Sequence, residues 1–286
     1  KKADDADKEE KKADKKADKK KEKPKFKEYA DVVKKDAVTK KGVFTTHLVD
    51  GKVFFEIPEA QLGREFVWQV KVAAIQTRKG TISADSARQY VYFERLGDDL
   101  LLRARDYSVI SNPGEPETFV VNAADIDAVL MRLPIVTFGE NKTPVVDVSD
   151  AFLGGVQGLE GMREHKMNGK DSIVKNVKAF ERNVEARVLG QFTRKEDKKQ
   201  WNGKVKKVTV PVTAEIRHSI LALPDTLMKP RYYNHRVGFF DAQYINYTGD
   251  KNKVEKNRFI KRWRLEKKNP NAKISEPVKP ITWYID

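Results

Sequence analysis

The side chains best suited to binding zinc are few in this 286-residue chain, which has four histidines and no cysteine. The histidines are His47, His165, His218 and His235, none lies four residues from another, and the zinc-protease motif HExxH is absent. His47 falls in a predicted strand and His218 has no second histidine nearby, so both are expected to be ordinary structural or exposed histidines. The spacing predicts no metal site in this chain.

Other catalytic patterns are missing as well. The glycines at Gly154, Gly155 and Gly158 lack the GK[ST] sequence that would complete a phosphate-binding loop, so they are expected to shape a turn. No GxSxG motif is present, and no pair of carboxylates can be brought together from the sequence. We therefore assign no catalytic residue and no cofactor to this chain, and we expect no enzyme activity from it alone.

The most unusual segment runs from residue 227 to residue 240. It places two arginines, a proline and a glycine among four aromatic residues, outside any clear strand period. This composition suits an ordered loop that contacts another surface, although a loop packed on its own domain is equally consistent with it. The residues assigned to this interdomain or binding loop are Arg231, Tyr232, Tyr233, Asn234, Arg236, Gly238, Phe239 and Phe240.

A net charge of +15 raises the question of nucleic-acid binding. Residues 1–28 hold thirteen lysines and nine acids, so most of the excess charge is spread over the long remainder of the chain. Residues 258–265 alternate cations with aromatic and aliphatic residues, which favours a half-buried strand with a cationic outer face over a stacking surface. We therefore expect no nucleic-acid partner.

The elements that must position these residues are strands. Extended runs flank the turn dipeptide Asp50-Gly51, a strong hairpin signature, and further extended runs follow one another without long helical crossovers. This pattern predicts a mainly β fold, with antiparallel sheets in sandwich-like layers and a few short helices. Residues 194–203 are expected to form a polar surface loop. No apolar window approaches the roughly 18 residues of a membrane-spanning helix.

The chain is expected to divide into four parts. Residues 1–25, almost entirely Lys, Asp, Glu and Ala, should form a disordered tether, because like charges recur every four residues and no apolar stripe is present. Residues 26–78 should hold a short helix and the first hairpin, and residues 79–280 the main β-rich domain. Residues 281–286 are expected to begin a strand that leads into a further domain.

Several segments, taken in order, resemble the N-terminal, non-catalytic region of large bacterial zinc-dependent metalloproteases, a region that carries only unknown-function labels. The segments are residues 35–44, 54–58, 62–66, 145–154, 228–240, 263–265 and 280–286. In the family that the chain resembles, this loop usually reads M-x-P-R-x-x-D-x-R-V-G-[YF]-F. The chain matches this pattern at Met228, Pro230, Arg231, Arg236, Val237, Gly238, Phe239 and Phe240. It departs at Asn234, where Asp is usual in this pattern; asparagine keeps a hydrogen bond but lacks the charge for an ion pair.

The resemblance implies a partner and a location. It implies that zinc and the catalytic HExxH belong to a downstream catalytic domain of the same polypeptide, on which this region docks and whose substrate cleft it helps to shape. Peptide or protein substrate could also contact it, and a periplasmic or extracellular location is implied. The alternative is a stand-alone binding module for peptide, glycan or an anionic polymer.

Overall fold

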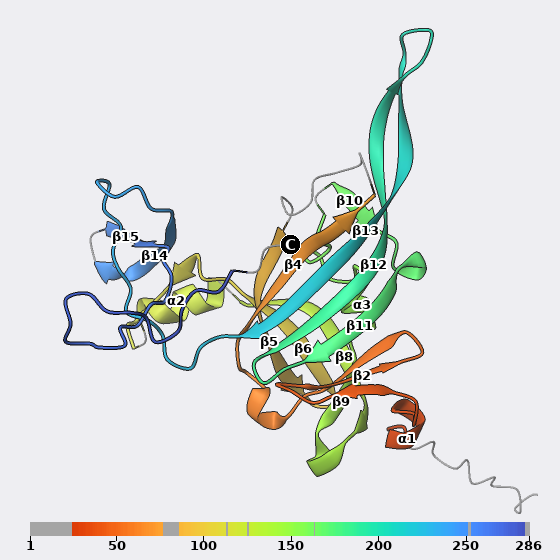
Figure 1. Ribbon diagram of the computed structural model, residues 1–286, viewed down its shortest axis with the longest axis horizontal. Helices are drawn as coiled ribbons and strands as arrows, with labels where there is room; N and C mark the ends of the chain where they lie inside the picture. Colours follow the sequence, from red (N-terminus) through yellow and green to blue (C-terminus); the bar gives the residue numbers. More distant parts are fainter. Residues whose placement is uncertain are drawn as a thin grey trace, which may run out of the picture.

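A tight hairpin lies near one end of the large sheet in the computed structural model (Figure 1). The structure describes residues 25–76, 86–112, 114–124, 126–162, 164–250 and 253–283. The strands of the hairpin are β2 (Thr45–Val49) and β3 (Lys52–Glu56), and the two residues between them have positive φ, 49° at Asp50 and 77° at Gly51. Such a turn matches the twist of the flanking strands, so the hairpin predicted from these residues is confirmed.

Twelve strands make up this sheet, and every pair of neighbours in it is antiparallel. The other ten are β1 (Val38–Lys40), β4 (Phe66–Ile75), β5 (Ser86–Leu96), β6 (Asp99–Arg105), β8 (Ala128–Phe138), β9 (Pro144–Asp147), β10 (His165–Met167), β11 (Ile173–Ala179), β12 (Asn183–Lys199) and β13 (Val205–Ala222). Their order is β1-β2-β3-β9-β8-β6-β5-β4-β13-β12-β10, with β11 also paired to β12.

The sheet curls until its two ends nearly meet. β11 lies against β2, and the backbone N–H of Val43 donates a hydrogen bond of 2.7 Å to the carbonyl of Phe180, just beyond β11. We call this contact the seam. The prediction of a mainly β, antiparallel chain with few helices is confirmed, and the near-closure leaves little of the sheet without a neighbouring strand.

The interior of the curled sheet is filled by aromatic and branched side chains. Along β4 the buried residues Phe66, Trp68, Val70 and Val72 alternate with more exposed ones, as a strand with one face on the core requires. Phe44 is fully buried beside the seam, and its ring centroid lies 5.0 to 5.6 Å from those of three other phenylalanines.

The glycine-rich segment helps to fill this interior. Gly154, Gly158 and Gly161 have φ values between 83° and 85°, and the turns they make bury Val156, Leu159 and Met162. The expectation that these glycines shape turns is confirmed at Gly154 and Gly158.

Helices are short. They are α1 (Tyr29–Val32), α2 (Glu117–Ala124) and α3 (Ser149–Phe152), with single 3₁₀ turns η1 (Glu59–Gln61), η2 (Glu140–Lys142) and η3 (Gly169–Asp171). Of these, α3 contributes Ala151 and Phe152 to the core. Within the described ranges none of the helices is long and apolar enough to cross a membrane.

A second, smaller sheet forms a separate lobe. It consists of β7 (Val109–Ile110), β14 (Asp241–Asp250) and β15 (Lys253–Ile260), and β7 pairs with β14 in parallel, unlike the strands of the large sheet. We call this sheet, α2 and residues 223–240 and 261–283 the C-terminal lobe (Figure 1). Residues 1–24 of the expected tether (1–25), the boundary near residue 78 and residues 284–286 lie outside the described residues.

The prediction of a polar surface loop at residues 194–203 is wrong. β12 continues to Lys199 and β13 begins at Val205, so most of this segment belongs to one long hairpin that projects from the sheet (Figure 1). The lysines and acids here have low strand propensity, but cross-strand pairing overrides it.

Candidate interaction site

The predicted loop lies alongside the end of β15. Ile260 N–H donates to the Arg231 carbonyl at 3.0 Å, Tyr233 N–H donates to the Arg258 carbonyl at 2.9 Å, and Lys261 N–H donates to the Phe240 carbonyl at 2.7 Å. The backbone of the loop is therefore held at both ends against its own lobe.

One aromatic side chain anchors the loop. The guanidinium of Arg258 lies 3.9 Å from the ring centroid of Tyr233, which is half-buried, and its Nε donates to Asp241 Oδ2 at 2.6 Å. The hydrogen bond from Arg258 lowers the pKa of the Asp241 carboxyl. Arg258 is thus occupied within the lobe.

Asn234 has a local backbone role. Its Oδ1 accepts a hydrogen bond of 3.0 Å from the N–H of Arg236, and its carbonyl accepts the N–H of Val237 at 3.0 Å. This is an Asx turn, which Asp and Asn form equally well. The asparagine therefore forms a turn that an aspartate at this position would also form.

The other side chains of the loop are largely exposed, although the ring centroid of Tyr232 lies 5.2 Å from that of Phe259. Tyr232 is 71% exposed and Phe240 is 86% exposed, and Arg231, Asn234, Arg236, Gly238 and Phe239 are also exposed. Of the eight predicted residues, only Tyr233 is partly covered. The structure brings the eight together on one lobe, and the docking role assigned to them remains a prediction.

A groove of about 720 Å³ runs beside this loop. It is lined by Arg231, Phe239, Lys261, Arg262, Trp263 and Leu265. Trp263 also meets Trp283, which is 73% exposed, with ring centroids 6.0 Å apart. Phe239, Trp263, Leu265 and Trp283, together with Tyr232 and Phe240, are named the aromatic face.

Residues 258–265 do not form the half-buried strand expected from their alternation. β15 ends at Ile260, and both Trp263 and Leu265 are exposed. Arg262 donates to the Lys229 carbonyl at 2.6 Å and Arg264 to the Thr226 carbonyl at 2.5 Å. The arginines tie the chain to residues 226–229 instead of extending the sheet, so the tryptophans remain outside the core, and sequence patterning missed them as surface residues.

The histidines do not form a metal-binding cluster within the described ranges of the chain. His47 and His218 are both buried, and the part of the chain that the structure describes contains no group of three or more His, Cys, Asp or Glu side chains that could hold a metal ion. The resemblance implies zinc for a downstream catalytic domain, and we derive no chemistry through zinc for this chain.

His47 belongs to a hydrogen-bonded network that secures the N-terminal elements. Its Nδ1 lies 2.9 Å from Thr39 Oγ1 on β1, and its Nε2 lies 3.3 Å from Glu56 Oε2, which also accepts the hydroxyl of Tyr29 at 3.4 Å. Burial lowers the pKa of His47, and Glu56 partly opposes this effect. The network ties α1 and β1 to β2 and β3.

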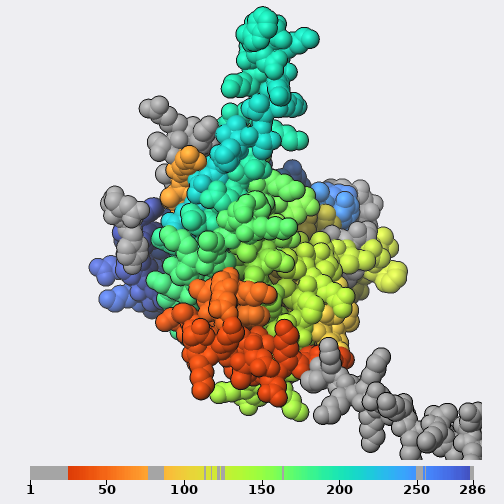
Figure 2. Space-filling model, turned by 90° about the vertical axis from the view of Figure 1, so that its right-hand side faces the viewer, coloured from red at the N-terminus to blue at the C-terminus, as the bar shows by residue number. Residues whose placement is uncertain are grey.

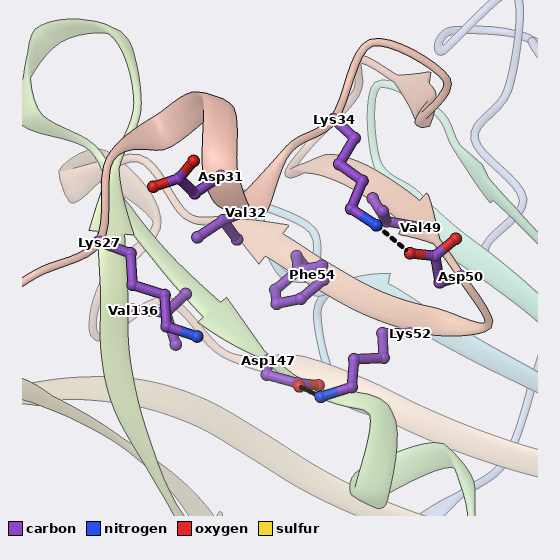
Figure 3. Close-up of a pocket in the computed structure, with 10 residues that line it drawn as sticks. All are labelled: Lys27, Asp31, Val32, Lys34, Val49, Asp50, Lys52, Phe54, Val136 and Asp147. Carbon is purple, nitrogen blue, oxygen red and sulfur yellow. Dashed lines mark hydrogen bonds and ion pairs between the residues drawn. The ribbon is translucent and has the colours of Figure 1, made fainter.

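A second hollow, of about 330 Å³, lies between α1 and the outer face of the sheet (Figure 3). Val32, Val49, Phe54 and Val136 supply its apolar surface. At its rim Lys34 pairs with Asp50 at 2.5 Å and Lys52 with Asp147 at 3.4 Å. Because these charges are paired within the chain, we interpret the hollow as a joint that holds α1 and assign it no ligand.

Fold and surface together define a mainly β protein, built on a nearly closed antiparallel sheet, that presents an aromatic face on a smaller lobe. Residues 83–268 match the domain of unknown function DUF5117, and residues 26–75 match the domain of unknown function DUF5118. The chain belongs to the DUF5117 family. No curated protein and no solved structure matches it.

Proposed function

We propose that this chain is a non-catalytic accessory region of a bacterial zinc metallopeptidase, which docks through the aromatic face on the catalytic domain and helps to shape its substrate cleft. The observation that carries the proposal is the exposure of large aromatic side chains around one groove. Soluble chains rarely leave contiguous apolar surface uncovered, and aromatic and arginine side chains are the usual anchors of protein interfaces.

The arrangement of charge supports a protein partner for this face. Arg231 and Arg236 are exposed beside the aromatic residues, where they could donate hydrogen bonds to a partner. Arg258, Arg262 and Arg264, the cations that a polymer-binding module would use, are engaged within the lobe. The resemblance to metalloprotease N-terminal regions supplies the class of partner and a periplasmic or extracellular location.

Docking can be measured with the zinc peptidase domain of the same polypeptide supplied in trans, after the coding sequence downstream of Asp286 is read for HExxH. Replacing Trp263 with serine should weaken binding by about 30-fold, because a central aromatic hot spot contributes about 2 kcal/mol or more. The matched control is Trp201→Ser, which removes an exposed tryptophan on the distant hairpin. Equal affinities for the two variants, or no complex with the unmodified chain, would contradict the proposal.

The proposal also predicts that the purified 286-residue chain lacks peptidase activity, even with added zinc. The reason is that His47 and His218 are buried, and no group of three or more His, Cys, Asp or Glu side chains that could hold a metal ion exists among the described residues. A fluorogenic peptide mixture and a casein assay would test this. EDTA-sensitive proteolysis by the purified chain would show that it carries its own catalytic site.

A further inference from the structure

The long hairpin of β12 and β13 extends past its neighbours in the sheet. On one side β10 ends its pairing at Arg194, and on the other β4 ends its pairing at Ala214. Residues 195–209, named the hairpin arm, then continue as two strands in unbroken register to the pair Lys199↔Val205 (Figures 1 and 2). Among the described residues no third strand pairs with the arm. An isolated two-stranded ribbon buries little apolar surface and is marginally stable at best, so the stability of the fold does not explain the length of the arm.

The tip of the arm is an ordered turn. Gln200 N–H donates to the Lys204 carbonyl at 2.8 Å, Gly203 N–H donates to the Gln200 carbonyl at 3.0 Å, and Lys204 N–H donates to Asn202 Oδ1 at 3.0 Å. Gly203 has φ of 78°, which the turn requires. The turn holds Trp201 outward, and this side chain is 99% exposed. A large aromatic residue is thus presented at the outermost point of a fixed scaffold.

The stem behind the tryptophan is strongly cationic. Between residues 195 and 207 the arm has six lysines against two acids, and every residue from 197 to 207 is exposed. Lys198 lies directly opposite Lys206 in the register, a like-charge pair that destabilises an isolated ribbon. Lysines also discourage free strand edges from pairing with other chains. That role explains neither the facing lysines nor a bare tryptophan at the tip.

We propose that the hairpin arm binds the surface of an anionic lipid bilayer. Tryptophan prefers the boundary between headgroups and acyl chains, and lysines near it bind anionic headgroups while their methylene stems cover apolar surface. The arm has this order, with the aromatic residue at the tip and the cations behind it. Single-stranded nucleic acid is a poorer fit, because stacking proteins line a groove with several aromatic residues and the arm has one.

Flotation with lipid vesicles tests the proposal on the full chain. Vesicles of phosphatidylcholine with about one third phosphatidylglycerol should bind the protein, pure phosphatidylcholine vesicles should not, and binding should fall as salt is raised. Trp201→Ser should reduce partitioning about tenfold, as expected for the loss of a partly buried aromatic side chain. The double variant Lys198→Gln/Lys206→Gln should reduce it about 25-fold, at about fivefold per lysine near an anionic surface.

Two control variants distinguish binding through the arm from binding that any exposed tryptophan or any pair of exposed lysines would support. Trp263→Ser removes an exposed tryptophan from the aromatic face, and Lys40→Gln/Lys41→Gln removes two exposed lysines near β1. Both should stay within twofold of the unmodified chain, and all variants keep residues 1–24. Failure to bind the anionic vesicles, binding that the arm variants leave unchanged, or arm-dependent capture of a thymidine 20-mer without capture of vesicles would overturn the proposal.

Discussion

Replacing Gly42 with alanine should lower the free energy of unfolding by about 3 kcal/mol, the upper range for a methyl group forced against neighbouring atoms. A Cβ at this position would lie 2.4 Å from the Phe180 carbonyl oxygen, 2.6 Å from its nitrogen and 2.8 Å from the carbonyl carbon of Ala179. All three are backbone atoms next to β11, so no side chain can rotate away. The seam must open to accommodate the methyl group.

The loss should be larger than one contact suggests, because Gly42 adjoins the residue that bridges the seam. Val43 N–H donates to the same Phe180 carbonyl, and Val43 and Phe44 belong to the buried core. Moving the backbone near Phe180 therefore weakens a hydrogen bond and the packing of the aromatic cluster together. Urea unfolding followed by tryptophan fluorescence measures the difference in free energy.

Gly238→Ala is the matched control. Gly238 has no positive φ, and a Cβ there would meet no atom within 4 Å, so the same methyl group should change stability by less than about 0.5 kcal/mol. Equal midpoints for the two variants would mean that the seam can relax without cost. Such a result would remove near-closure of the sheet as a source of stability.

The seam shows which part of the fold the sequence could predict and which part it could not. The hairpin at Asp50-Gly51 is encoded locally, because two residues that tolerate positive φ separate two runs of strand-forming residues. Gly42 and Phe180, by contrast, are in contact at the seam although most of the strands of the large sheet lie between them in the strand order. No local pattern indicates which glycine lies against which distant backbone, so near-closure could not be predicted.

The proposed interaction surfaces also include parts that the sequence could predict and parts that it could not. The 227–240 loop was recognisable because its composition fits neither a helix nor a strand, and its side chains are mostly exposed. The alternation around Trp263 predicts a strand there, and only the tertiary structure shows that β15 stops before it. The sequence predicts a loop where β12 continues into the hairpin arm, because lysine-rich segments have weak strand propensity and the pairing partner that stabilises this part of β12 is β13.

His218 should make the protein sensitive to acid. It is fully buried, Trp68 Nε1–H donates to its Nδ1 at 3.1 Å, and the rings of Trp68 and Phe152 pack against it. Nδ1 therefore accepts and the neutral ring carries its proton on Nε2. Among the described residues this Nε2 has no hydrogen-bond partner. Burial lowers the pKa of His218 to about 3, far below its ordinary value of 6.5.

The direction of the effect follows from where protons bind. Below pH 6.5 the unfolded chain takes up a proton at His218 and the folded chain does not, so stability is present above this pH and is lost as the pH falls toward 3. Between pH 7 and pH 4.5 this one group should remove about 2.5 kcal/mol of unfolding free energy. A protonated ring would also lose the hydrogen bond from Trp68, because both ring nitrogens would then be donors.

His218→Asn tests this, since asparagine keeps an acceptor for Trp68 and cannot take up the proton. The variant should be less stable at pH 7 because of the smaller side chain, and its unfolding free energy should fall by about 2.5 kcal/mol less than that of the unmodified chain as the pH is lowered to 4.5. His235→Asn, at an exposed position, should reproduce the original pH dependence. If His218→Asn and His235→Asn lose stability in parallel with acid, the acid sensitivity arises elsewhere, and the buried imidazole must have gained a compensating partner such as a buried water.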